Sequence, residues 1–381
     1  MNFTEDQIMI GDMVAKLCVD EIAPKAEMRD KEKCYPKEEV EALFAHGIMG
    51  MTVSENYGGS GADTLSQALS IEHIARANGG LSTIVAVQSL VCGILEKCGN
   101  EAQKQKYLTK LTSDTVGAFA LTEPHAGSDA SALRTTAVRE GDFYILNGSK
   151  QFITSGQTGG LAIIFAVTDP SAGKKGISAF IVATDSEGYD ASRLEDKMGQ
   201  HCSDTAQVVL TNVKVPAENR IGEEGDGYKI ALSNLENGRI SIAAQCLGLA
   251  RAAYVEASSY ARDRKTFGKA IAEHQAVGFK LAEMKTKLFA ASHMVYEAAA
   301  LKDSQQPCLQ EACMAKLYAS EAAIEIADKA LQIHGGYGYI QDYPIERIYR
   351  DVRVCSLYEG TSDIQKMIIS RGILKVEKIR K

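Results

Sequence analysis

The sequence lacks the cysteine and histidine patterns that mark disulfide frameworks and metal sites. Its nine cysteines are an odd number, and neither a C-x-x-C pair nor an H-E-x-x-H motif occurs among the 381 residues. The histidines form no cluster with the cysteines at metal-ligand spacing. We therefore expect no metal, and reduced, mostly buried thiols of the kind found in cytoplasmic proteins.

The chain also lacks a basic excess and any segment typical of membrane or secreted proteins. Its net charge is −7 and its pI about 5.6, so it has no basic footprint for nucleic acid. We find no apolar run that approaches the ~20 residues of a membrane-spanning helix. Residues 1–7 are polar and acidic, unlike a signal or transit peptide. We expect a cytoplasmic, bacterial-type protein, although a processed organelle protein would look the same.

The length and the hydrophobic patterning predict three segments around a large core. A chain of 381 residues has room for two or three domains. Helical spacing dominates residues 1–117, where Thr4 and Gln7 match a capping box. Pro24 should end or kink the first helix, and Pro36 should open a short one.

A β segment is predicted over residues 118–223 and a second helical segment over 224–381. Short apolar or alternating runs predict strands near 116–121, 135–139, 143–146, 161–167, 177–183 and 207–215. Helical spacing returns from about 227, with further helices over 272–302 and 309–334 on either side of Pro307. This order favours a mainly α protein with a β middle domain.

Near the C-terminus, the stretch Y-E-G-T-S-D-I-Q (358–365) places a carboxylate on a turn. Ser362 and Gln365 have capping-box spacing before an apolar run, so a helix should begin at about Ser362. Glu359 then precedes the helix, and Gly360 allows a bend or a close ligand. Taken alone, this is most simply a solvated loop glutamate beside a helix cap.

Four other segments carry residue types suited to a flavin and a phosphate. Loop hydroxyls can donate to a flavin edge, an aromatic ring can pack on its face, and a guanidinium can bind a pyrophosphate. Each segment alone also has an ordinary structural reading, such as a strand-connecting loop or a helix stop. The segments are F-A-L-T-E-P-H-A-G-S-D-A (119–130), N-G-S-K-Q-F-I-T-S-G (147–156), R-D-R-K-T-F-G-K (262–269) and Q-I-H-G-G-Y-G-Y (332–339).

Together with 358–365, these ordered segments resemble the acyl-CoA dehydrogenase family, most closely its short-chain (butyryl-CoA) or short/branched-chain members. The resemblance covers essentially the whole chain. It implies an N-terminal helical domain, a β-barrel-like middle domain and a C-terminal four-helix bundle. Periodicity alone gives neither of the last two arrangements.

The resemblance implies an FAD cofactor, part of which is held across a subunit interface. The segment around Arg264 and the segment 332–336 match family residues that reach the FAD of a neighbouring subunit. The residues expected to contact FAD are Phe119, Leu121, Thr122, Ser128, Phe152, Ile153, Thr154, Arg264, Thr266, Phe267, Gln275, Gln332, Ile333, Gly335, Gly336, Thr361 and Asp363.

The resemblance also assigns the base and the substrate contacts. Glu359 matches the catalytic glutamate. Some family members carry that glutamate at about position 238 instead, where this chain has glycine, which cannot act as a base. The residues expected to contact the acyl-CoA are Ser128, Glu236, Asn237, Gly238, Arg239 and Gly360.

This chain departs from the family pattern at two positions near the expected flavin. His125 stands where glycine or asparagine is usual, and a histidine there can alter access or titrate near neutral pH. Phe152 stands where many members have tryptophan, and the chain has no tryptophan at all. Flavin packing at this position should therefore be looser.

The implied activity is α,β-dehydrogenation of an acyl-CoA to a trans-2-enoyl-CoA, with Glu359 as base and hydride transfer to the flavin. Electrons would pass to electron-transfer flavoprotein, and the expected assembly is a homotetramer, a dimer of dimers. Two alternatives remain open: an acyl-CoA oxidase, and a redox-inert CoA-binding or assembly protein of the same fold. Acyl length, branching and pathway are not fixed by the sequence.

Overall fold

The computed structural model describes residues 3–379, which begin with a helical segment. Its helices are α1 (Glu5–Leu17), α2 (Ala26–Glu32), α3 (Lys37–Ala45), α4 (Thr64–Ala77), α5 (Gly79–Cys98), α6 (Glu101–Gln103) and α7 (Thr109–Ser113). Thr4 and Gln7 form the predicted capping box at the start of α1. Around Pro24 the helix loosens into a π turn (Cys18–Ile22) and a 3-10 turn (Ala23–Lys25), which confirms the expected break. Pro36 is the N-cap of α3, one residue before the helix begins.

Helix α5 corrects the expectation that no segment is long and apolar enough to span a membrane. Its 20 residues meet that test by length and composition, with a mean hydropathy of 1.5. However, 83% of the tested window is buried inside the protein, as in the core helix of a globular domain. The polar side chains of Gln88 and Ser89 interrupt its apolar character in the sequence but are themselves buried.

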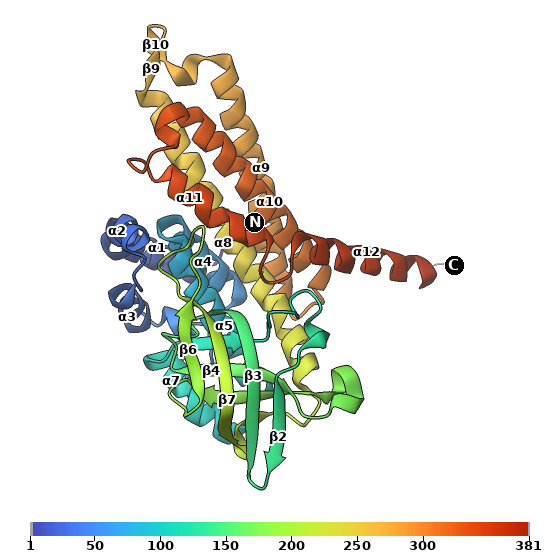
Figure 1. Cartoon of the computed structure of the whole chain (residues 1–381). Coiled ribbons are helices and arrows are strands. Elements are labelled where there is room, and N and C mark those ends of the chain that lie inside the picture. Colours follow the sequence, from blue (N-terminus) through green and yellow to red (C-terminus); the bar gives the residue numbers. More distant parts are fainter. Residues whose placement is uncertain (1–2, 380–381) are drawn as a thin grey trace.

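The middle of the chain forms one eight-stranded sheet (Figure 1). Its strands are β1 (Gly117–Ala120), β2 (Thr136–Glu140), β3 (Phe143–Thr154), β4 (Leu161–Val167), β5 (Ile177–Ala183), β6 (Tyr189–Leu194), β7 (Thr205–Pro216) and β8 (Arg220–Ile221). They run in the order β6-β7-β3-β2-β4-β5-β8, and β1 pairs in parallel with β4. The sheet therefore places the loop after β1 beside the far end of β3, since the backbone N–H of Gln151 donates to the Thr122 carbonyl at 2.9 Å.

Two features of the sheet differ from the sequence-based expectation. Strand β3 continues to Thr154 instead of ending at Leu146, because β-bulges between Leu146 and Gly148 and between Lys150 and Ile153 carry it past polar residues. Strands β6 and β8 were not expected, because β6 is a polar edge strand without a clear apolar alternation and β8 has only two residues.

The C-terminal segment is built on three long helices, α8 (Gly227–Asp263), α9 (Gln275–Asp303) and α10 (Leu309–His334). The short hairpin β9 (Lys265–Thr266) and β10 (Lys269–Ala270) joins α8 to α9, and Pro307 lies in the next connection, as expected. Two more helices follow, α11 (Ile345–Val352), which was not expected, and α12 (Ser362–Ile379). Figure 1 shows α8, α9 and α10 side by side, whereas α12 extends away from the body of the chain.

The two helical segments share one core. The largest cluster of buried apolar side chains draws on α1, α4, α5, α8, α9, α10 and α11, and the sheet has its own clusters on its two faces. All nine cysteines are free thiols; Cys34 and Cys98 are partly buried and the others are buried. Among residues 3–374, whose side chains the structure describes, no group of three His, Cys, Asp or Glu side chains could hold a metal ion.

A buried ion pair holds the loop after β1 to the sheet. Lys150 Nζ donates to Glu123 Oε1 at 2.7 Å and to the carbonyls of Leu121 and Phe165 at 3.3 and 2.6 Å. Glu123 also accepts the backbone N–H groups of Arg134 and Thr135. Burial lowers the pKa of Lys150 to about 8 against the attraction of Glu123. For Glu123, burial opposes the charged form, but Lys150 and the N–H donors prevail and lower its pKa.

We expect Lys150→Met to destabilise the protein by about 3–5 kcal/mol, because it leaves the buried Glu123 carboxylate without its cation. Urea unfolding monitored by circular dichroism measures the change. Lys31→Met is the matched control, since Lys31 makes an exposed i,i+4 pair with Glu27 and should change stability by less than about 0.5 kcal/mol. Equal stability of Lys150→Met and wild type would contradict the assigned role of the ion pair.

Candidate active site

The turn that carries Glu359 has an unusual backbone. It connects a 3-10 turn (Arg353–Ser356) to α12, and Glu359 has a φ of 52°, followed by Gly360 at 90°. A positive φ is uncommon for a residue other than glycine and persists only where the surroundings enforce it. Here Gln365 Nε2 donates to the carbonyls of Glu359 and Gly360 at 3.1 and 2.8 Å. The turn is therefore tied to the first turn of the helix that follows.

The cap of α12 differs from the expected Ser362–Gln365 box. Thr361 is the capping residue, and its Oγ1 accepts the backbone N–H of Ile364 at 3.3 Å. Gln365 is fully buried, so its amide turns back to the carbonyls of Glu359 and Gly360 and is not available to Ser362. The helix nevertheless begins at Ser362, as predicted.

Glu359 is half-buried, and its carboxylate lies in a partly cationic environment. Its Oε2 is buried and has no hydrogen-bond partner in the protein. Burial raises the pKa of Glu359, while the nearby charges of Arg239 and Lys316 act to lower it. A β-carbon at position 238 would lie 2.8 Å from Oε2, so the glycine there leaves space for the carboxylate. Gly238 and Glu359, the two positions at which the resemblance allows a base, are thus neighbours in space.

The expected substrate residues at the start of α8 divide into two groups. Gly238 and Arg239 are buried beside Glu359, and Arg239 Nε is a further buried donor without a partner. Glu236 instead pairs with Lys302 of α9 at 2.7 Å and accepts the Cys308 thiol at 3.4 Å. Asn237 is half-buried. Two unpaired buried groups of opposite charge, Glu359 Oε2 and Arg239 Nε, therefore remain for a polar substrate group.

The expected flavin residues of the sheet gather around the contact between the β1 loop and β3. Phe119 and Thr122 are half-buried, and Ser128 is exposed. Phe152 is 64% exposed with a φ of 59°, another residue held in a sparsely populated conformation. Thr154 is half-buried at the end of β3.

Some of the residues expected to contact FAD can do so only through their backbone, and others lie at the edge of this group. The side chains of Leu121 and Ile153 belong to the apolar clusters of the sheet. The Thr361 hydroxyl is used as the α12 cap, and Asp363 is exposed in the first turn of that helix. His125 is exposed, with Nε2 at 3.5 Å from Glu123 Oε2.

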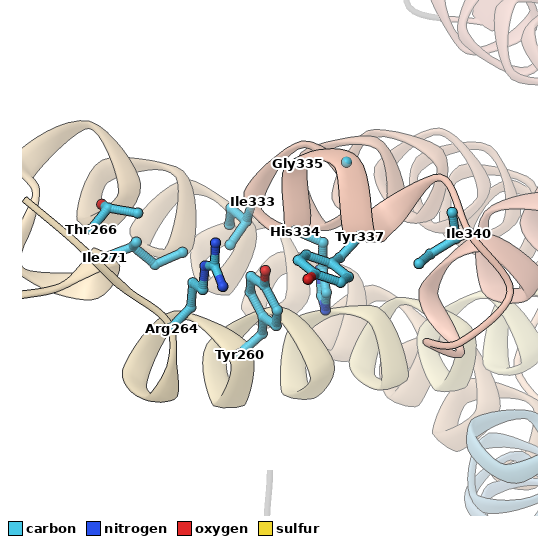
Figure 2. Close-up of a pocket in the computed structure, with 10 residues that line it drawn as sticks. Tyr260, Arg264, Thr266, Ile271, Ile333, His334, Gly335, Tyr337 and Ile340 are labelled. Carbon is cyan, nitrogen blue, oxygen red and sulfur yellow. The ribbon is translucent and has the colours of Figure 1, made fainter.

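The remaining expected cofactor residues lie at the other end of the C-terminal helices. A cavity of about 520 Å³ lies between the ends of α8 and α10, and Figure 2 shows the residues that line it. It is lined by Tyr260, Arg264, Thr266, Ile271, Ile333, His334, Gly335, Gly336, Tyr337 and Ile340. The side chain of Arg264 lies 5.5 Å from the centre of the Tyr337 ring. Of the expected residues, Phe267 is 97% exposed with a φ of 51°, and Gln275 and Gln332 are exposed outside the lining.

This cavity fits a phosphate-bearing group. A β-carbon at Gly335 or Gly336 would meet no atom within 4 Å, so the space before these glycines is open to a ligand. Arg264 presents a rigid cation to the same space, and Tyr260 and Tyr337 add aromatic faces (Figure 2). The cavity lies beside the β9–β10 hairpin, at the opposite end of the molecule from the sheet (Figure 1). One chain therefore does not bring its two sets of expected FAD residues together.

Several residues of the site were not singled out in the sequence. Lys316 of α10 is fully buried and donates to the Gly360 carbonyl at 2.8 Å. A lysine on a helix face otherwise made of Ala312, Ala315 and Ala319 was the available signal. Gln245 and the Glu123–Lys150 pair gave no comparable local signal, because their partners are distant in sequence.

Comparison with known proteins identifies related sequences over almost the whole chain. Three family models match: the acyl-CoA dehydrogenase N-terminal domain at residues 4–115, the middle domain at 118–213 and the C-terminal domain at 225–374. An acyl-CoA dehydrogenase of Bacillus subtilis (strain 168) is 47% identical over 98% of this chain and 99% of its own length. The caffeyl-CoA reductase-Etf complex subunit CarC of Acetobacterium woodii is 45% identical over 98% of this chain and 100% of its own.

Solved structures show the same fold. The structure of butyryl-CoA dehydrogenase from Megasphaera elsdenii matches with a TM-score of 0.96 and 42% identity, covering 98% of this chain and 99% of that chain. A chain from a study of the electron transferring flavoprotein of Acidaminococcus fermentans matches with a TM-score of 0.97 and 44% identity, with the same coverage. PigA, solved with FAD and proline, matches with a TM-score of 0.94 and 30% identity over 98% of both chains. The chain thus belongs to the acyl-CoA dehydrogenase family of FAD-dependent oxidoreductases.

Proposed function

We propose that this protein removes the α-proton and the β-hydrogen of a short-chain acyl-CoA thioester, with Glu359 as the base. The observation that carries this proposal is the Glu359 carboxylate, whose Oε2 is buried and unpartnered beside Gly238. A carboxylate freed from water and from protein donors is a stronger base toward a weakly acidic C–H. The likeness to butyryl-CoA dehydrogenase supports a short acyl chain.

The residues of the turn would divide the chemistry between them. Glu359 takes the α-proton while its own backbone N–H donates to the thioester oxygen and stabilises the enolate charge. Arg239 keeps a positive charge near the carboxylate, which favours its ionised form before the substrate binds. FAD, when bound, supplies the acceptor for the hydride that leaves the β-carbon. The balanced products are a trans-2-enoyl-CoA, protonated Glu359 and the reduced cofactor.

We also propose that two copies of the chain complete each FAD site. Phe119, Thr122, Ser128, Phe152 and Thr154 would hold the flavin end. The cavity around Arg264 and Gly335 lies at the opposite end of the same chain, so it would hold the diphosphate and adenosine of a partner's FAD. A dimer is the smallest such assembly, and a tetramer of two dimers follows the family resemblance.

Electron-transfer flavoprotein is the proposed electron partner. Support comes from the CarC relative, whose name places it in a reductase-Etf complex, and from the Acidaminococcus structure, whose study concerns an electron transferring flavoprotein. Turnover with this partner and not with oxygen would separate a dehydrogenase from an oxidase.

A second candidate function is the reverse reaction, reduction of a 2-enoyl-CoA. The specific observation is that the CarC relative is named a reductase. The same geometry serves both directions, because a carboxyl group whose pKa is raised by burial can return the proton to the α-carbon. Anaerobic mixing of reduced enzyme with crotonyl-CoA tests this direction by reoxidation of the flavin.

We expect Glu359→Gln to bind FAD and acyl-CoA but to lose proton abstraction, because the amide keeps the size of the side chain and removes the base. Anaerobic mixing with butyryl-CoA should bleach the wild-type flavin, and the variant should react at least ~10²–10⁴ times more slowly. The panel runs from butyryl- to palmitoyl-CoA and includes isobutyryl- and 2-methylbutyryl-CoA. Glu321→Gln, an exposed site on α10, is the control. Bleaching of Glu359→Gln at the wild-type rate would exclude Glu359 as the base.

We expect Arg264→Ala to release FAD on dialysis and to lower the thermal unfolding temperature. A charge-assisted contact to the diphosphate is worth about 1.5–3 kcal/mol, and its loss weakens ligand-linked stability. Arg262→Ala is the matched control, because Arg262 is exposed two residues away and does not line the cavity. Equal FAD retention by both variants would contradict a contact between Arg264 and FAD and would leave Arg264 as an ordinary solvated side chain.

Hybrid assemblies test whether the site is shared between copies. Co-expressed Glu359→Gln and Arg264→Ala chains should regain activity, because one site of each hybrid then has Glu359 from one chain and Arg264 from the other. A hybrid of the double variant with wild type should contain no intact site. If the hybrid of the two single variants is inactive while the hybrid of the double variant with wild type is active, each chain completes its own site. Sedimentation of a stable FAD-saturated monomer would contradict the shared site as well.

A further inference from the structure

Lys316 is a charged side chain in a position where the fold does not need a charge. It lies on α10, it is fully buried, and the neighbouring positions on its helix face are Ala312, Ala315 and Ala319. Removing an ammonium group from water costs several kcal/mol unless other groups compensate. Its hydrogen bond to the protein runs from Nζ to the Gly360 carbonyl at 2.8 Å.

That hydrogen bond alone does not explain the lysine. The same Gly360 carbonyl accepts Gln365 Nε2 at 2.8 Å, so it is satisfied without Lys316. A methionine would fill the same space without the cost of burying a charge. Lys316 adds a positive charge near the turn at Glu359–Gly360 and a second hydrogen bond to the Gly360 carbonyl.

The groups that face Lys316 come from each element packed around it. Helix α8 contributes Cys246 and Arg239, the 3-10 turn before Glu359 contributes Cys355, and the catalytic turn contributes Glu359. Burial raises the pKa of Cys246 well above its usual value, so this thiol stays neutral. Burial lowers the pKa of Lys316, and the attraction of Glu359 opposes this shift. Glu359 is thus the carboxylate among the groups that act on Lys316.

We propose that Lys316 is a positioning residue for the reaction assigned to Glu359. It fixes the Gly360 carbonyl, and with it the left-handed backbone that directs the Glu359 N–H and carboxylate, and it adds a positive charge near that carboxylate. This inference rests on the proposed function, since it concerns the same base. The hydrogen bond and the charge can be tested separately, because a neutral donor at position 316 can keep the hydrogen bond to the Gly360 carbonyl and remove the charge.

The test uses two variants in the FAD-bound enzyme. Lys316→Met removes the donor and the charge, and Lys316→Gln removes the charge but keeps a donor. The positive charge favours the carboxylate, so its loss should raise the pKa of Glu359 and move the pH midpoint of flavin bleaching by butyryl-CoA to higher pH in both variants. At a pH below the midpoint, a variant whose midpoint lies one pH unit higher should react about tenfold more slowly than wild type. At high pH, Lys316→Gln should recover more of the wild-type rate than Lys316→Met.

An independent readout follows the protonation of Glu359 without turnover. Infrared pH-difference spectra contain a carboxyl band for Glu359, which the Glu359→Gln variant identifies by its absence. This band should titrate at higher pH in both Lys316 variants than in wild type. Lys329→Met is the matched control, because Lys329 lies on the same helix, is paired with Glu283 and is partly exposed. It should leave the rate, the midpoint and the band unchanged.

Failure of the role of Lys316 and failure of the proposed function give different results. Wild-type midpoints in both Lys316 variants, by kinetics and by infrared, overturn the role of Lys316 and leave the proposed function intact. A wild-type enzyme that no acyl-CoA bleaches contradicts the proposed function, while the infrared titration still reports whether Lys316 acts on Glu359. If Lys316→Met does not fold, as judged by its FAD content, Lys316→Gln alone decides the effect of the charge.

Discussion

A single buried amide, that of Gln245 in the middle of α8, joins the parts of the chain that meet at the active site. Its Nε2 donates to the Gly79 carbonyl and to the hydroxyls of Ser82 and Thr83, all on α5, and its Oε1 accepts the hydroxyl of Tyr358. Thr83 in turn donates to Gln200 at 2.6 Å, and the Gln200 N–H donates to Asp351. One network thus fixes α5, α8, α11 and the residue before Glu359. Because every member except the half-buried Tyr358 is buried, the loss of one partner leaves an unsatisfied polar group.

The charges around Glu359 oppose one another in a way that suits its proposed role as the base. Burial disfavours the carboxylate, whereas Arg239 and Lys316 favour it. Neither cation makes a direct ion pair with Glu359 in the described residues, so both act through space and leave Oε2 free. A direct salt bridge would stabilise the carboxylate more strongly, but it would lower the pKa and occupy the oxygen that must take the proton.

The sequence predicted what depends on neighbouring residues and missed what depends on distant ones. The capping box at Thr4 and the start of α12 were predicted, because hydrogen bonds within one helical turn decide them. The identity of the second cap was wrong, since Gln365 is recruited by carbonyls outside the helix. Strand β3 was cut short at Leu146 because its bulged part is stabilised by pairing with β7, which leaves little local pattern. Lys316 was missed although the alanines around it on α10 offered a local signal, because only its contact with the Gly360 carbonyl shows that it belongs to this site.

The expected FAD residues form two sets that one chain does not bring together. The family resemblance implies the same arrangement, because it assigns one of these sets to the FAD of a neighbouring subunit. Arg264 and Gly335 are 71 positions apart in sequence, yet the ends of α8 and α10 bring them into one cavity, at the opposite end of the molecule from the sheet (Figure 1). Under the proposed assembly, the contacts that hold the cofactor also hold two chains together, so FAD binding and association are thermodynamically linked. Each copy would then gain a complete site only when its partner is folded at the distant end of its helices. Assembly and catalytic competence would therefore be lost together.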